Sequence, residues 1–119
     1  MRFCFFSVLI IPILLIGCTK DKVNNSNDNS CNLPNEITFS QNVSQILAQS
    51  CYPCHQTPGS GGINLDNYLD VKNQALSGQL VHSISNDSSY IIMPPPPMNG
   101  LDSCQANTIK KWISQGCKF

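Results

Sequence analysis

Length and composition restrict the chain to one small domain without a nucleic-acid-binding surface. The first 17 of the 119 residues read as a removable signal, and the remaining 102 leave no room for a second independent core. Seven basic residues balance seven acidic ones, and loss of Arg2 with the signal gives a formal charge of −1. Such a chain offers no basic surface for a nucleic acid backbone. Seven cysteines are a high count, typical of an oxidising compartment or of a bound metal or cofactor.

The N-terminus has the pattern of a secretory signal. Arg2 precedes an apolar run of about 14 residues, which is shorter than the roughly 20 that a membrane-spanning helix needs. Leu15-Ile16-Gly17-Cys18 resembles a bacterial lipobox, in which the cysteine is diacylated and becomes the first residue of the mature protein. The alternative is an ordinary signal peptide with an incidental cysteine. With Cys18 acylated, we expect a protein of the cell envelope, lipid-anchored on the periplasmic side or at the outer membrane of a Gram-negative bacterium.

The segment after Cys18 is polar and predicts a tether. Residues 19–35 consist mainly of Asn, Ser, Asp and Lys, with Val23, Cys31 and Leu33 as the apolar exceptions. Such a stretch cannot bury enough surface to offset its ordering entropy. We therefore expect a signal peptide over residues 1–17, a lipid-anchored flexible tether over 18–36 and a folded domain over 37–119.

The first half of the folded domain shows helical spacing of apolar residues. A first helix is predicted to begin after a Ser40 cap and to run into Cys51. A second is predicted after an Asp66 cap and stops at Gly78. A short third piece spans residues 80–84, and residues 56–65 form an irregular stretch.

The last helix has the clearest signals. Asp102, with Gln105 three residues later, resembles a capping box, and Gly116 marks the end. Between them, one apolar stripe is formed by Ala106, Ile109, Trp112 and Ile113. Because no segment alternates like a strand, the predicted class is all-α, with a proline loop over residues 93–100.

The most informative stretch is Cys51-Tyr52-Pro53-Cys54-His55. A Cys-x-x-Cys-His sequence is what c-type haem attachment requires, because two thiols can add to the two vinyl groups of one porphyrin while the adjacent imidazole faces the iron. Cys51 and Cys54 would form the thioethers, and His55 would be the proximal ligand. A thioredoxin-like dithiol would need a preceding strand, and a plain disulfide would leave His55 unexplained. A structural zinc site would need a second close ligand pair, whereas Cys104 and Cys117 are thirteen residues apart.

Three side chains are candidates for the second axial position of the iron: Met93, Met98 and His82. A methionine thioether favours ferrous iron and raises the potential. Four prolines separate the two methionines and predict a rigid, extended loop at about 3.1 Å per residue. The two methionines would then hang from backbone positions roughly 15 Å apart, so one iron would not accept either interchangeably.

The order of elements from Phe39 to Gly116 resembles the single-haem, class I-like cytochrome c domains of bacterial lipoproteins, especially those of the Bacteroidetes type. Beyond the haem motif, the likeness depends on Gly61-Gly62-Ile63-Asn64-Leu65-Asp66-Asn67-Tyr68, Met93-Pro94, Leu101-Asp102-Ser103-Cys104 and Ile109-Lys110-Lys111-Trp112-Ile113. The resemblance implies a small fold of three to five helices around one covalently attached haem c. In that family the distal ligand is the methionine directly before a proline, which corresponds to Met93.

Three cysteines remain after lipid and haem attachment: Cys31, Cys104 and Cys117. The predicted last helix would hold Cys104 and Cys117 roughly 20 Å apart, beyond the limit of about 7 Å for a disulfide. Cys31, on the flexible approach to the first helix, can reach either. Similar proteins often carry both Cys31 and Cys104 and have alanine in place of Cys117, so the resemblance favours Cys31–Cys104. Cys117 would then be a free or intermolecular thiol, and Cys31–Cys117 is the alternative pairing.

Together these features predict an electron-transfer protein rather than an enzyme. A membrane-tethered cytochrome c would cycle between ferric and ferrous states with His55 and Met93 on the iron. It would exchange electrons with redox partner proteins of unknown identity, and no nucleic acid would be involved. The alternatives are a haem enzyme or a gas or peroxide sensor with an open sixth position, and a thiol-disulfide oxidoreductase.

Overall fold

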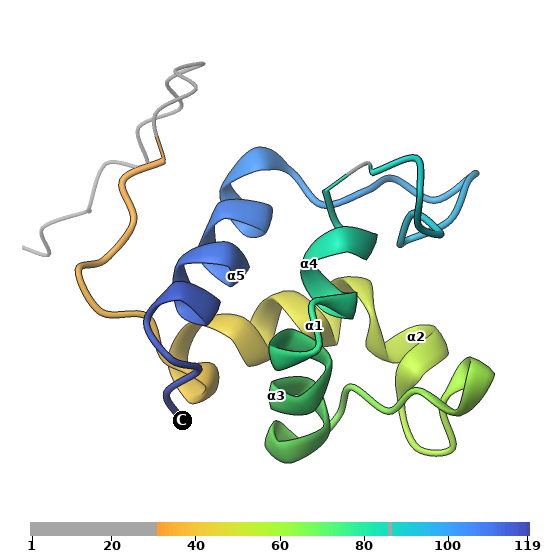
Figure 1. Ribbon diagram of the computed structural model, residues 1–119, viewed down its shortest axis with the longest axis horizontal. Coiled ribbons are helices and arrows are strands. Elements are labelled where there is room, and N and C mark those ends of the chain that lie inside the picture. The colour runs from red at the N-terminus through yellow and green to blue at the C-terminus, as the bar shows by residue number, and fades with distance from the viewer. Residues whose placement is uncertain (1–30, 86) are drawn as a thin grey trace, which may run out of the picture.

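All regular secondary structure in the described part of the chain is helical. The computed structural model describes residues 31–85 and 87–119, so the predicted signal peptide, Cys18 and most of the predicted tether lie outside the described residues. Within these residues there is no strand, which confirms the all-α class, and no helix long and apolar enough to cross a membrane. The elements are η1 (a π-helix, Phe39–Val43), α1 (Ser44–Ser50), α2 (Tyr52–His55), η2 (a 3-10 helix, Ser60–Gly62), α3 (Tyr68–Leu76), α4 (Gln79–Ser83) and α5 (Ser103–Ser114) (Figure 1).

The cap of the first helix lies two residues before the predicted one. Thr38 has extended backbone, and its Oγ1 accepts a hydrogen bond from the N–H of Gln41 at 3.3 Å. The Thr38 carbonyl also accepts from the N–H of Val43, five residues on, which gives the first turn its π-helical form. The prediction of a Ser40 cap was therefore wrong, because Ser40 already lies inside the helix.

The predicted cap of the second helix is wrong by one residue. Asn67 caps α3, with its Oδ1 accepting from the N–H of Asp70 at 3.0 Å. Asp66 instead accepts from the N–H and the hydroxyl of Thr57, at 3.0 and 2.9 Å. Gly78, with a φ of +83°, separates α3 from α4 in the left-handed conformation that glycine adopts without strain.

Helix α5 has the predicted capping box. Asp102 accepts from the N–H of Gln105 at 2.8 Å, and the Gln105 side chain accepts from the N–H of Asp102 at 3.1 Å. This reciprocal pair satisfies two backbone donors at the start of the helix. Ile109 and Trp112 on its apolar face are fully buried, as the stripe predicts.

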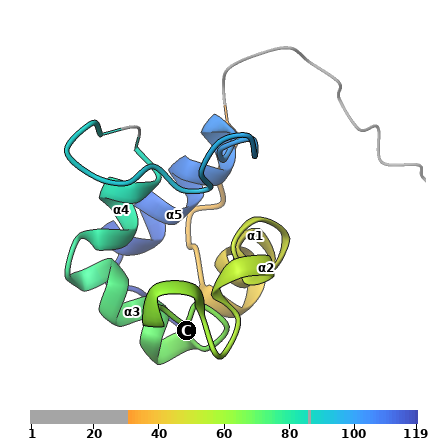
Figure 2. The ribbon, with the colours of Figure 1, turned by 90° about the vertical axis from the view of Figure 1, so that its right-hand side faces the viewer.

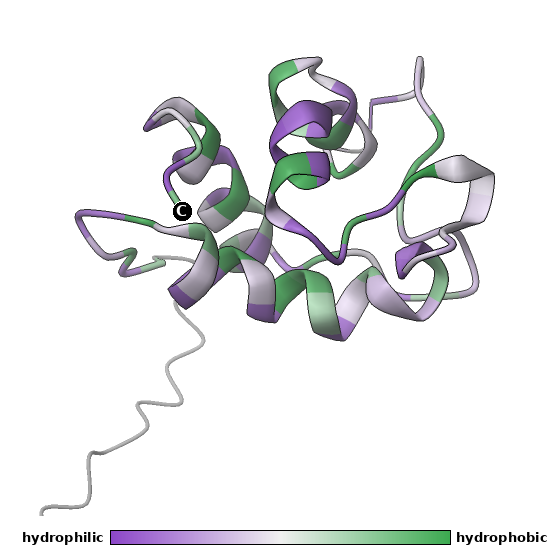
Figure 3. Cartoon of the chain, turned by 90° about the horizontal axis from the view of Figure 1, so that it is seen from below, coloured by the Kyte–Doolittle hydropathy of each residue, from purple (hydrophilic) through white to green (hydrophobic). Residues whose placement is uncertain are grey.

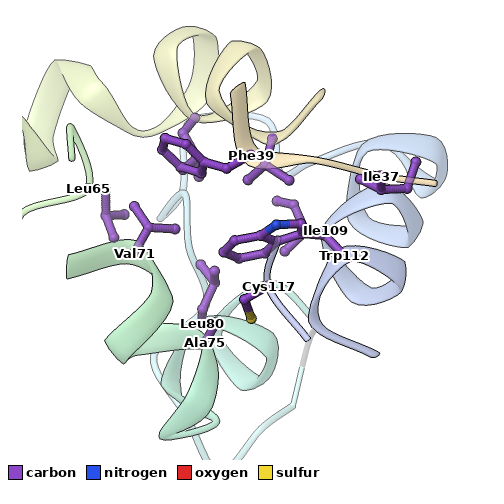
Figure 4. Close-up of a cluster of buried hydrophobic side chains, with 11 residues drawn as sticks. Ile37, Phe39, Leu65, Val71, Ala75, Leu80, Ile109, Trp112 and Cys117 are labelled. Atoms are coloured by element: carbon purple, nitrogen blue, oxygen red, sulfur yellow. The ribbon is translucent and has the colours of Figure 1, made fainter. Parts of the chain in front are cut away.

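The hydrophobic core lies between α5, η1–α1 and the α3–α4 pair (Figures 2 and 4). Trp112 occupies the middle of the labelled cluster, with its ring 6.0 Å from that of Phe39 and its Nε1 donating to the Lys118 carbonyl at 2.7 Å. Hydrophobic and hydrophilic residues follow one another along the helices, as expected for helices with one buried face (Figure 3). The core consists of Ile37, Phe39, Val43, Leu47, Leu65, Val71, Ala75, Leu80, Ile109, Trp112 and Cys117.

Cys117 belongs to this core. Its exposed fraction is 0%, and its thiol is not in a disulfide. Burial raises the pKa of this thiol, with nearby Lys72 opposing the shift. Of the two expectations for Cys117, the structure agrees with the free thiol, and burial of the sulfur counts against an intermolecular bond.

Residues 31–36 form a strap along α5, visible beside that helix in Figure 1. Lys111 Nζ donates to the Pro34 carbonyl and Gln115 Nε2 to the Asn35 carbonyl, both at 2.7 Å. The structure joins Cys31 to Cys104 in a disulfide with Cα atoms 5.4 Å apart. This part of the predicted flexible tether is therefore held against the domain, because α5 supplies partners that the local composition does not reveal.

Candidate functional site

A cavity of about 690 Å³ lies between the Cys-x-x-Cys-His segment, the α3–α4 pair and the loop of residues 89–98. This volume is in the range of small-molecule and cofactor sites. Its lining includes Cys51, Cys54, His55, Met93 and Met98, so one space contains both halves of the predicted site. No lining residue is Asp, Glu, Lys or Arg, and the walls are largely apolar.

The single-turn helix α2 places the three groups of the motif together. The carbonyl of Cys51 accepts from the N–H groups of Cys54 and His55, at 3.2 and 2.8 Å. Residues at positions i, i+3 and i+4 of a helix share one face, so both thiols and the imidazole are directed to the same side. The spacing that identifies the motif in the sequence thus becomes a common orientation in the fold.

A hydrogen bond orients the ring of His55. Its Nδ1 lies 3.1 Å from the carbonyl oxygen of Ile63. Because a carbonyl oxygen can only accept, this contact requires the proton on Nδ1 and leaves Nε2 of the neutral ring free to bind a metal. Sequence reasoning missed this partner, because nothing about residue 63 marks its carbonyl as special.

The irregular stretch after α2 is braced by short-range hydrogen bonds. Leu65 N–H donates to the His55 carbonyl at 2.7 Å, and Gly59 N–H donates to Asn64 Oδ1 at 2.8 Å. Two further bonds, from Thr57 to Asp66, join residues that flank this Gly59–Asn64 pair in the sequence. Their effect is to fix the Ile63 carbonyl relative to α2.

The two thiols of the motif are unpaired. Burial, with a smaller contribution from the Cys54 thiolate, raises the pKa of Cys51 to about 11. A reactive dithiol of the thioredoxin kind needs a cysteine with a lowered pKa. The environment of Cys51 has the opposite effect, which counts against a thiol-disulfide oxidoreductase.

The proline loop is not the extended rod that its composition predicts. The Met98 N–H donates to the Pro95 carbonyl at 3.1 Å, so the chain turns within the proline run. Met93 and Met98 both line the cavity. An extended run with backbone positions roughly 15 Å apart therefore no longer separates the two methionines as candidate ligands. Pro94 and Pro95 line the cavity as well, so part of the proline run covers it.

The two methionines nevertheless differ in how they are held. The N–H of Met93 donates to the Ser83 carbonyl at 2.9 Å, which attaches it to the end of α4, and Met93 is half-buried before a buried Pro94. Met98 is 46% exposed, and its backbone bond is to Pro95 within the loop itself. Of the two, Met93 has the more fixed position.

His82 is placed away from the cavity lining. Its ring stacks on Tyr90 with centroids 4.3 Å apart, and its Nδ1 lies 3.2 Å from Asp87 Oδ2. These contacts give His82 a role in joining α4 to the following loop.

Across residues 31–85 and 87–119, no three His, Cys, Asp or Glu side chains gather into a group that could hold a metal ion. A haem iron does not need such a group, since the porphyrin supplies four of its ligands. Comparison with protein-family models, curated proteins and solved structures finds no significant match to the chain.

Proposed function

We propose that the protein is a c-type cytochrome that carries electrons through one covalently bound haem. The observation that carries this proposal is the convergence of Cys51, Cys54, His55 and Met93 on one cavity without charged walls. These residues come from two segments about forty positions apart in the sequence. The first segment offers two thiols and an imidazole for one face of a haem, and the second offers a thioether for the other face. The largely apolar lining suits a porphyrin ring.

The residues of α2 fit the group in detail. Cys51 and Cys54 would hold the haem through thioether bonds, and His55 would present Nε2 to the iron because its Nδ1 donates to Ile63. When bound, the haem supplies a one-electron couple between ferric and ferrous iron. The chain's contribution is to position the ligands and to exclude water from the iron.

Met93 is the distal ligand in this proposal. Its attachment to α4 through Ser83 and its half-buried position support this role over Met98. A thioether in the sixth position favours electron transfer without a change of ligand, whereas an open position would suit peroxide reduction or gas binding. The electron carrier is therefore preferred to the haem enzyme or sensor.

The proposal extends to the location of the protein. A lipid on Cys18 would anchor the domain to a membrane of the cell envelope, where it would exchange electrons with redox partner proteins. Cys18 is outside the described residues, and this part depends on its lipobox-like sequence.

Haem staining after denaturing electrophoresis tests the covalent attachment. The wild-type band should stain, and Cys51→Ala/Cys54→Ala should lose the stain completely. Pro53→Ala is a matched control, because it changes the exposed middle of the motif without removing a thiol or the histidine. Extraction of the haem from the wild type into acidified organic solvent would contradict the proposal.

A further inference from the structure

The backbone at Gly59 approaches another part of its loop more closely than a side chain permits. A Cβ atom at this position would lie 1.8 Å from the carbonyl oxygen of Ile63 and 2.7 Å from its carbonyl carbon. The φ of Gly59 is −74°, a value open to any residue, so backbone conformation is not the reason for glycine here. The reason is the close approach to Ile63.

The carbonyl that Gly59 approaches is the one that orients His55. Ile63 O accepts from His55 Nδ1–H at 3.1 Å. A methyl group at residue 59 would have to push this oxygen away from its present position, because the two closest atoms belong to the backbone; the Asn64 Oδ1 would lie 3.0 Å away. The space left by the missing Cβ is thus part of the site's geometry.

Asn64 ties Gly59 into the loop that carries this carbonyl. Its Oδ1 accepts from the Gly59 N–H at 2.8 Å, and the Asn64 side chain is partly buried in the loop. Residues 59 and 64 are therefore joined to each other next to residue 63 in the folded loop.

We propose that Gly59 and Asn64 are positioning residues that hold the Ile63 carbonyl against His55 Nδ1 and so set how strongly His55 donates to the iron. The inference rests on the proposed haem. A hydrogen bond from the outer nitrogen of a ligating histidine to a carbonyl raises the basicity of the ligand. Greater basicity favours ferric iron, so the positioned carbonyl lowers the reduction potential.

The test uses the haem-loaded protein and two readouts other than activity. One is the reduction potential. The other is the iron–histidine stretching frequency of the ferrous haem, measured by resonance Raman in a Met93→Ala background. We expect Gly59→Ala to raise the potential and to lower the stretching frequency, because the displaced carbonyl no longer accepts from His55.

Gly100→Ala is the matched control. Gly100 lies outside the loop of His55, its φ is not in the left-handed region, and a Cβ there meets nothing within 4 Å. The control therefore makes the same glycine-to-alanine change without strain at Ile63, and both readouts should stay at their wild-type values.

A second pair of variants tests the inference in case the Gly59→Ala protein does not bind haem. Asn64→Ala removes the bond to Gly59 and should lower the stretching frequency in the same direction, while Asn64→Asp keeps an acceptor oxygen and should restore it. Wild-type frequencies in both Gly59→Ala and Asn64→Ala, an equal shift in Gly100→Ala, or no restoration in Asn64→Asp would overturn the inference. An unstained wild-type band would instead refute the proposed haem, so the two failures are distinguishable.

Discussion

Replacement of Cys31 and Cys104 by serine should cost a large part of the stability of the domain. The disulfide links residues 73 positions apart, and the segment between them contains both the Cys51–His55 motif and Met93. On a chain-entropy model, closing a loop of this length restricts the unfolded chain by about 4 kcal/mol. Small domains are stable by about 5–15 kcal/mol in total, so the loss would be conspicuous.

The effect on thermal stability follows from the same figure. For a domain of this size, each kcal/mol moves the unfolding midpoint by about 4–8 °C, so the double variant should melt roughly 15–30 °C lower. Iron ligation by His55 and Met93 would already restrict part of the unfolded loop. The value of about 4 kcal/mol is therefore an upper limit for the loss of stability.

Urea and thermal unfolding of the haem-loaded protein, followed by far-ultraviolet circular dichroism, measure this loss. Lys111→Ala is the control, because it removes one exposed strap bond to the Pro34 carbonyl and leaves the disulfide intact. This control should cost about 1 kcal/mol. The reasoning is refuted if the double variant shifts no more than the control, or if non-reducing peptide mapping finds no linked Cys31 and Cys104 peptides.

Three further outcomes are expected. The weak far-red band of methionine-ligated ferric haem should vanish in Met93→Ala and persist in Met98→Ala and His82→Ala, and loss in Met98→Ala alone would move the assignment to that residue. In the haem-loaded mature protein, a thiol reagent should find no fast-reacting thiol in native buffer and one, Cys117, in denaturant; fast native labelling would contradict the burial of Cys117. In the haem-free chain, burial raises the pKa of Cys51 to about 11 from its ordinary value near 9. The protonated thiol therefore contributes fully to the stability of the folded state below about pH 9, and this contribution is lost as the pH rises through about 11. The rate of alkylation of Cys51 should keep rising between about pH 9 and pH 11. A plateau of the alkylation rate near pH 9 would show that the thiol is exposed.

The features that sequence reasoning predicted correctly depend on partners three or four residues away. The capping box of Asp102 and Gln105 and the stop at Gly78 are chemistry of this kind. The two misplaced caps occur where neighbouring residues can both cap. Asp66 stands beside Asn67, and the choice between them is made by Thr57, which binds Asp66 from across the loop. A local pattern contains no information about that competitor.

The features that the sequence did not reveal depend on partners far along the chain or on backbone atoms. The bonds of the strap to Lys111 and Gln115 span 77 and 80 residues. The carbonyl of Ile63 has the same chemistry as every other carbonyl, and its role appears when the loop closes against His55. The turn of the proline run is closed by a bond from the Met98 N–H to the Pro95 carbonyl, which an extended polyproline segment does not make.

The two sides of the cavity are held in different ways, and this difference bears on the chemistry. On the side of His55, bonds from Leu65 N–H to the His55 carbonyl and from His55 Nδ1–H to the Ile63 carbonyl tie ligand and loop together.

In the loop of residues 89–98, the main backbone tie of Met93 to a helix is its own bond to Ser83. Partial unfolding begins where few bonds hold the chain, so the loop of Met93 should open at lower cost than the segment of His55. A haem in this cavity would keep its histidine and lose its methionine first. With the proposed haem bound, the free energy of that loop would decide whether the sixth position stays closed. Strengthening or weakening the contact at Ser83 would be the direct way to change this.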